Sequence, residues 1–134
     1  MPSIPTEKLA EAAANDIVDA FSQILAPLGV AIESVTREVA FVTVVAKTTA
    51  SFIVATWDPR DRFSYWIGPL ADAQVPPRKL WYDLAGFMAY DPALLESRPD
   101  LRYHRVSPLA GARAIEAFAS APLRGDWSQR PILD

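Results

Sequence analysis

The chain has 134 residues, of which 51% are hydrophobic and 22% charged, and a formal net charge of −3. This length and composition are typical of one globular domain with its own core, and they argue against an intrinsically disordered chain. The acidic balance disfavours nucleic-acid binding, because a phosphate backbone selects a basic surface. The sequence has no cysteine, which excludes disulfides and thiolate chemistry.

No apolar run is long enough to span a membrane, and the N-terminus lacks the basic and apolar regions of a signal peptide. We therefore expect a cytoplasmic protein without a membrane partner. We expect one domain over residues 1–134, with residues 1–5 and 128–134 flexible at its ends.

A long helix is predicted from Thr6 to about Leu25. Thr6 is a residue type that caps helices, and Pro27 and Gly29 end the helical pattern. Apolar residues recur at steps of three or four, which places them on one stripe of the helix. The stripe consists of Leu9, Ala13, Ile17, Phe21, Ile24 and Leu28.

Three antiparallel strands are predicted over residues 39–46, 52–57 and 63–67, where β-branched and aromatic residues dominate. The connections between them are too short for the crossover that parallel strands need. The preceding segment, 30–37, either extends the first strand backwards or forms a separate strand with a bulge near residues 37–38.

The predicted strands differ in how their two faces are expected to be covered. Both faces of the first strand are apolar, so we expect it to be covered on both sides. In the third strand Phe63, Tyr65 and Ile67 define a core face, and Trp66 is a large aromatic residue on the other face.

Helices are predicted to follow the meander. The first runs from Pro77 to Tyr90, a short one covers 93–97, and the last begins at Pro108 and ends at about Ser120. Asp91 and Ser107 each precede a proline, which is the pattern of a cap followed by the first helical residue. Residues 101–106 are ambiguous and could form a short strand, and the tail from 122 is expected to be irregular and packed on the surface.

The fold class that follows is α+β. A long N-terminal helix packs on a three- to four-stranded antiparallel meander sheet, and two or three C-terminal helices follow.

The sequence contains few groups suited to catalysis. His104 is the one histidine, so it could act as a general base, although a histidine without a catalytic role is the simpler interpretation. Asp58 and Asp61 could bind a hard cation or act as acid and base, but a turn with local ion pairs is the simpler explanation. No phosphate-binding loop or nucleophile motif is present. We therefore expect neither a metal nor a cofactor, and a protein that is not an enzyme.

Aromatic and arginine side chains are the strongest indication of function. Adjacent aromatic residues cannot all point inward, and exposed Trp, Tyr and Arg are the residue types of binding hot spots. The simpler interpretation is that they cover the edges of the core with their polar tips in water. We predict a contact surface on the second hairpin and on the helix after it. Its members are Trp57, Asp58, Arg60, Asp61, Arg62, Trp66, Trp81 and Tyr82.

Two functions are compatible with these patterns. The first is binding of another protein, since the order helix, three-strand meander, helices is loosely similar to small bacterial immunity proteins and some secretion chaperones; no motif supports either family. The alternative is a small-molecule-binding protein or enzyme with an apolar pocket between sheet and helices, lined by Phe41, Tyr65, Trp66 and Trp81, with His104 or Asp58 as its polar group. A homodimer through an uncovered sheet face or a strand edge fits both.

Overall fold

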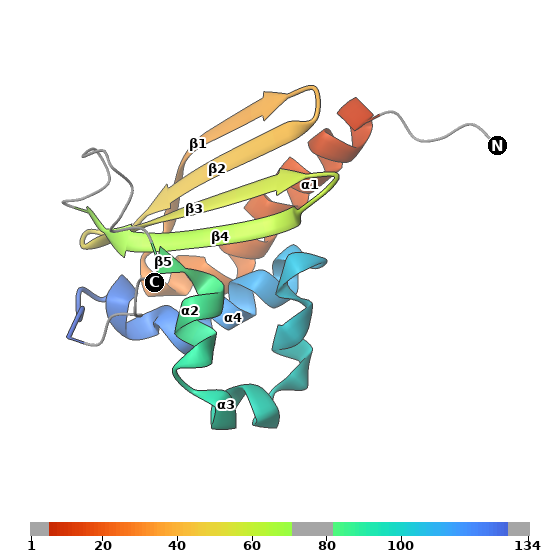
Figure 1. Ribbon diagram of the computed structural model, residues 1–134. Coiled ribbons are helices and arrows are strands. Elements are labelled where there is room, and N and C mark those ends of the chain that lie inside the picture. Colours follow the sequence, from red (N-terminus) through yellow and green to blue (C-terminus); the bar gives the residue numbers. More distant parts are fainter. Residues whose placement is uncertain (1–5, 71–81, 129–134) are drawn as a thin grey trace.

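The described part of the chain forms an antiparallel sheet with a layer of helices against one of its faces (Figure 1). The structure is a computed structural model, and it describes residues 6–70 and 82–128. Each strand pairs with its neighbours in sequence, in the order β1-β2-β3-β4-β5. The strands are β1 (Ala31–Glu38), β2 (Phe41–Lys47), β3 (Ser51–Asp58), β4 (Arg62–Pro69) and β5 (Tyr82–Asp83). The α+β prediction is confirmed, and the sheet has more strands than expected.

The N-terminal helix α1 (Thr6–Ala20) begins where predicted and continues through a π-helical turn, η1 (Phe21–Leu25), and a 3-10 turn, η2 (Ala26–Leu28). Gly29 ends it with a φ of 85°, a left-handed conformation that glycine adopts without strain. Leu9 was expected on the inward stripe but is 38% exposed. Small side chains make most of the buried face and let the helix approach the sheet closely. They are Ala10, Ala13, Ala14 and Ala20, with Ile17 among them.

The segment before the predicted meander is a separate strand, β1, which pairs antiparallel with β2. Residues 39–40 form the turn between the two strands. Their apolar side chains predict that both belong to a strand, and this is wrong: Val39 is 66% exposed in the turn. The register shifts between Ile32 and Ser34, so the irregularity lies there and not near residues 37–38 as expected.

The two faces of the sheet are covered differently. Core-face side chains of β2, β3 and β4 are buried beneath the helices, as the alternation of the third predicted strand indicated. On the opposite face, which we call the outer face, Thr43 and Val45 are half-buried and Phe41 is exposed. β2 is therefore covered on one face only, where we expected cover on both. The core face carries Val42, Val44, Ala46, Ile53, Ala55, Trp57, Phe63, Tyr65 and Ile67.

Three helices begin at the side-chain caps that their sequences provide. Asp83 Oδ1 accepts from the Ala85 amide at 2.9 Å, and Asp91 Oδ1 accepts from the Leu94 amide at 3.0 Å. Ser107 caps the last helix in the same way. The helices are α2 (Leu84–Ala89), α3 (Pro92–Ser97) and α4 (Pro108–Leu123).

Two C-terminal predictions need correction. The helix expected over 77–90 is described only from Leu84, because Tyr82 and Asp83 pair with β4 as β5; residues 77–81 lie outside the described residues. Segment 101–106 is not a strand: residues 101–105 belong to a 3-10 helix, η4 (Pro99–Arg105), and Val106 follows as a turn. No helix in the described ranges is long and apolar enough to cross a membrane.

Two hydroxyl groups, of Thr48 in the turn between β2 and β3 and of Ser51 at the start of β3, hold the end of α4. Thr48 Oγ1 donates to the Leu123 carbonyl at 3.0 Å, and Ser51 Oγ donates to the Pro122 carbonyl at 2.5 Å. Trp127 Nε1 in turn donates to Ser51 Oγ at 3.1 Å. These bonds reach carbonyls of the last helical turn, of which that of Pro122 also accepts from the Gly125 amide at 2.9 Å, and they join the sheet to the last helix.

Candidate functional site

A hollow of about 500 Å³ lies on the outer face of the sheet. Three strands and one turn line it, and their register fixes which side chains are neighbours. Val45, Val54 and Trp66 form one row across β2, β3 and β4, and Thr43, Thr56 and Ser64 form the next. We call this site the outer-face hollow; Phe41, Asp58 and Asp61 complete its lining.

The floor of the outer-face hollow is largely apolar. Val54 is only 6% exposed although it lies outside the core cluster, Trp66 is half-buried, and Phe41 is 38% exposed. Antiparallel sheets commonly present one polar face to water. This sheet instead offers valine and aromatic surface there, together with three hydroxyl groups.

The carboxylates of the site come from the turn between β3 and β4, and the turn itself is fixed by one of them. Asp58 Oδ1 accepts from the backbone amides of Arg60 at 2.8 Å and Asp61 at 2.7 Å. This is the Asx bonding typical of such turns. Arg62 has a φ of 60°, which completes the reversal. From η4, Arg105 Nη2 donates to the Asp61 carbonyl at 2.9 Å and ties the turn to the helical layer.

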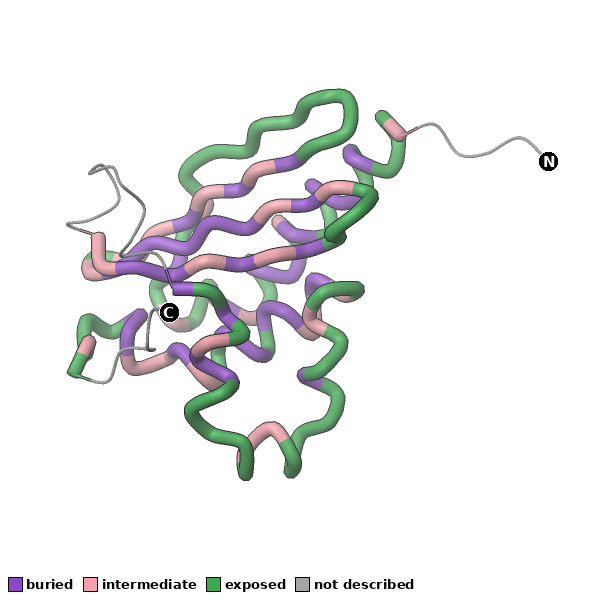
Figure 2. Tube along the Cα trace, viewed as in Figure 1, coloured by how far each residue is buried: buried purple, intermediate pink, exposed green. Residues whose placement is uncertain are grey.

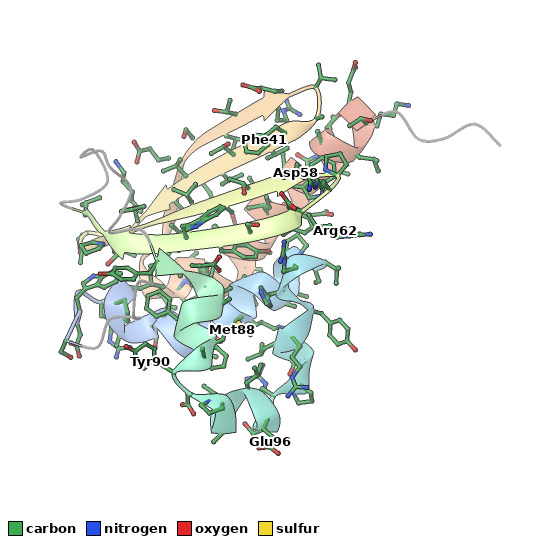
Figure 3. The ribbon with its side chains drawn as sticks, in the orientation of Figure 1. Phe41, Asp58, Arg62, Met88, Tyr90 and Glu96 are labelled. Carbon is green, nitrogen blue, oxygen red and sulfur yellow. The ribbon has the colours of Figure 1, made fainter. Side chains whose placement is uncertain are left out.

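Phe41 and Asp58 meet at one end of the outer-face hollow, and both are labelled in Figure 3 at that end of the sheet. The labelled Tyr90 and Glu96 lie on the helical side of the molecule, away from the sheet. An apolar floor thus ends at a rim with two carboxylates.

The residues predicted for partner contact do not all lie together. Asp58, Asp61 and Trp66 line the outer-face hollow, whereas Arg60 and Arg62 are exposed in its turn without lining it. We therefore treat these five as one region.

The remaining predicted contact residues lie elsewhere. Trp57 and Tyr82 are 8% and 3% exposed and belong to the core, so their burial does not favour a contact role. Trp81 lies outside the described residues. Tyr82 packs instead against Phe87 and Trp127, with ring centroids 6.1 and 5.6 Å away.

His104 lies in a different and much smaller pocket, of about 90 Å³, which Ser64 and Asp83 also line. Its Nδ1 lies 3.2 Å from the Leu101 carbonyl. No hydrogen bond between His104, Ser64 and Asp83 is present among the described residues, so the three side chains do not form a catalytic triad. Burial of the ring lowers the pKa of His104, although Asp83 acts in the opposite direction.

The described ranges contain no group of three His, Cys, Asp or Glu side chains placed to hold a metal ion. The Asp58 and Asp61 pair therefore lacks a third protein ligand of that kind within residues 6–70 and 82–128.

Sequence reasoning named Phe41, Asp58, Asp61 and Trp66 but missed the other members of the outer-face hollow. The missing residues are Thr43, Val45, Val54, Thr56 and Ser64. Alternation along each strand places these residues opposite the core face, and this signal could have found them once the core face was assigned. The alternative pocket expected between sheet and helices had included Tyr65, but that residue points to the core and is 1% exposed.

No family model, curated protein or solved structure matches this chain. The function proposed below therefore rests on the structure of this chain alone.

Proposed function

We propose that this protein binds a partner protein on the outer face of its sheet, with the outer-face hollow as the centre of the contact. The observation that carries the proposal is an apolar hollow of about 500 Å³ on the sheet face opposite the helices. Exposed apolar surface bordered by polar groups is typical of interaction sites.

The composition of the hollow suits recognition of a protein segment. Trp66 and Phe41 offer the aromatic surface from which hot spots are built. Thr43, Thr56 and Ser64 supply hydrogen-bonding groups between the apolar positions, and Asp58 and Asp61 favour a basic side chain at one end. Immunity to a toxin and secretion-chaperone activity are two forms that such binding could take.

A small-molecule ligand is the second candidate, and the volume of the hollow favours it. Ligand pockets typically measure about 300–1,000 Å³, but they bury most of the ligand surface. The outer-face hollow is floored by a sheet and opens to solvent on the side away from it, which fits a protein segment better. We propose no catalysis at this site, since His104 lies in the other pocket.

The test compares two threonine-to-lysine variants expressed in the native cell. Thr56 lies in the middle of the hollow, so Thr56→Lys places a long charged chain in the contact area. Thr49 is exposed in the turn between β2 and β3, so Thr49→Lys makes the same chemical change away from the site. Native mass spectrometry of the purified proteins measures the bound mass.

The proposal expects a stoichiometric protein partner on the wild type and on Thr49→Lys, and at least a tenfold lower occupancy on Thr56→Lys. A bound mass of small-molecule size that Thr56→Lys removes would favour the second candidate. Equal partner occupancy on both variants, with both folded by circular dichroism, would overturn the proposed surface.

A further inference from the structure

The strands at the centre of the outer-face hollow already have their backbone groups paired. Along residues 43–45 and 54–56, β2 and β3 each have an antiparallel neighbour on both sides. Their N–H and C=O groups therefore bond within the sheet. Figure 2 shows the surface that remains, where half-buried positions of β2 and β4 alternate with buried ones. The centre of the hollow thus offers side chains, and not a free strand edge, to the segment that fills it.

An extended segment on this floor would leave most of its own backbone groups without partners. From Phe41 to Val45 the hollow follows β2 for about 13 Å, which is about four residues of an extended chain. Each of these residues carries an N–H and a C=O group, whereas Thr43, Thr56 and Ser64 supply three hydroxyl groups. Buried polar groups without partners are costly. An α-helix bonds these groups within itself, so it can cover a surface made of side chains.

The row spacing of the sheet matches the rise of a helix. Successive rows of the outer face are two strand residues apart, which is about 6.6 Å, and four residues of a helix rise about 6 Å. A helix lying along the strands would therefore place positions i, i+4 and i+7 or i+8 over three rows. The first row is apolar at Val54 and Trp66, the second carries the hydroxyl groups, and the third contains Phe41. Apolar side chains at the two ends of this set, with a small or polar one between them, fit the rows.

The charge of the hollow selects one further side chain of the helix. Asp58 and Asp61 are both acidic, and no lysine or arginine lines the hollow among the described residues. Neither carboxylate forms an ion pair within residues 6–70 and 82–128, where the ion pairs join other residues. A helix that covers the hollow takes water away from these carboxylates, which is unfavourable unless the helix replaces the lost hydrogen bonds. A lysine or arginine does so with charge-assisted bonds.

We propose that the outer-face hollow binds an amphipathic α-helix of the partner protein, and that a lysine or arginine of this helix reaches Asp58 and Asp61. The basic residue lies about one turn beyond the apolar side chain that contacts Phe41. This inference rests on the proposed function, because it names the kind of partner segment for the same hollow. The helix would cover the outer face as α1 and α4 cover the core face.

Selection from two peptide-display libraries on the purified full chain tests the form of the segment. One library carries random positions on a rigid helix, and the other carries as many random positions on a segment constrained to be extended. We call a peptide hollow-specific when it binds Thr56→Lys at least tenfold more weakly than Thr49→Lys. The helical library should give most of the hollow-specific peptides, with lysine or arginine enriched at one fixed position.

The two libraries separate failure of this inference from failure of the proposed function. An equal or larger yield of hollow-specific peptides from the extended library would overturn the helical form and leave the proposed surface standing. If neither library gave a hollow-specific peptide, the proposed surface itself would be contradicted together with the helix.

A charge exchange tests the basic residue. The affinity of a selected helix, measured by fluorescence anisotropy, should fall at least tenfold on Asp61→Lys and less than twofold on Asp16→Lys. Asp16 is exposed on α1, so its variant makes the same chemical change away from the hollow. A peptide with glutamate in place of its basic residue should lose binding to the wild type and regain it on Asp61→Lys. Equal affinities for Asp61→Lys and Asp16→Lys, with both folded by circular dichroism, would overturn the basic residue.

Discussion

At the residue scale, one contact decides how closely the last helix approaches the sheet. Gly111 of α4 lies against the Tyr65 ring, and a Cβ atom built at this glycine would stand 2.2 Å from the tyrosine hydroxyl oxygen. Tyr65 is 1% exposed, and its hydroxyl has no hydrogen-bond partner in the described part of the chain. An added methyl group at position 111 would therefore overlap the ring unless the ring or the helix shifts.

Gly111→Ala should therefore destabilise the protein by about 1–3 kcal/mol, the usual cost of overpacking a core. Helix propensity alone predicts the opposite, since alanine is favoured over glycine by about 1 kcal/mol within a helix. Chemical denaturation measures the change.

The Tyr65→Leu background supplies the control for that prediction. A smaller side chain at position 65 leaves room for the Cβ atom, so Gly111→Ala should cost less there than in the wild type. An equal cost in the two backgrounds would show that the ring is not the obstacle.

His104 makes the stability of the fold depend on pH. Burial lowers its pKa below the ordinary value of 6.5, so the unfolded chain takes up a proton at a pH where the folded chain does not. The free energy of unfolding should therefore fall as pH decreases through about 6.5 toward the lower pKa of the folded state. Asp100 and Asp126, whose pKa values are also lowered, contribute only nearer the ordinary carboxyl value of 3.8.

Urea titrations at a series of pH values separate these contributions. His104→Gln should remove the slope between about pH 7 and pH 5 and leave the acid limb that the carboxylates cause. If the free energy of unfolding had the same slope against pH in the wild type and the variant over that window, groups other than His104 would cause the pH dependence.

At the scale of elements, hydrogen bonds from Thr48 and Ser51 hold the C-terminal end of α4 against the β2–β3 turn. Ser51 is fully buried and bonded to both the Pro122 carbonyl and the Trp127 indole. Ser51→Ala should cost about 1–3 kcal/mol, because it removes two hydrogen bonds from a fully buried position, although the Pro122 carbonyl keeps its bond from the Gly125 amide.

Ser22→Ala is the comparison for this variant, since Ser22 is exposed on η1. Its melting temperature should stay close to that of the wild type. If the melting temperature of Ser51→Ala were equally close to that of the wild type, the Ser51 hydrogen bonds would add nothing to stability.

Local rules predicted the starts of α3 and α4, whereas elements that depend on non-local contacts were predicted less well. Asp91 and Ser107 act within three residues of themselves, so their caps could be recognised in the sequence. The bond from Thr48 to Leu123 spans 75 residues, and no local pattern indicates it. The sequence does not decide how β1 is formed, because a strand with both faces largely exposed has no apolar alternation to mark it.

At the scale of the whole molecule, one face of the sheet forms the core and the other face is accessible to a partner. The helices contact one face of the sheet and bury it, and the outer face keeps an apolar hollow. The third predicted strand indicated this division, with its core residues on one side and Trp66 on the other. The hollow itself could not be predicted, because it needs the register of three strands, and the first predicted strand had been extended into the turn at 39–40.

Site-specific photo-cross-linking in the native cell tests the proposed outer-face contact most directly. A benzophenone amino acid replaces Phe41 at the rim of the outer-face hollow or Tyr103, which is 64% exposed on η4. Position 41 should give one discrete protein adduct, identified by mass spectrometry, which Thr56→Lys in the same chain abolishes and Thr49→Lys does not. The same adduct from position 103, or an adduct at position 41 that survives Thr56→Lys, would contradict a partner bound on the outer face of the sheet.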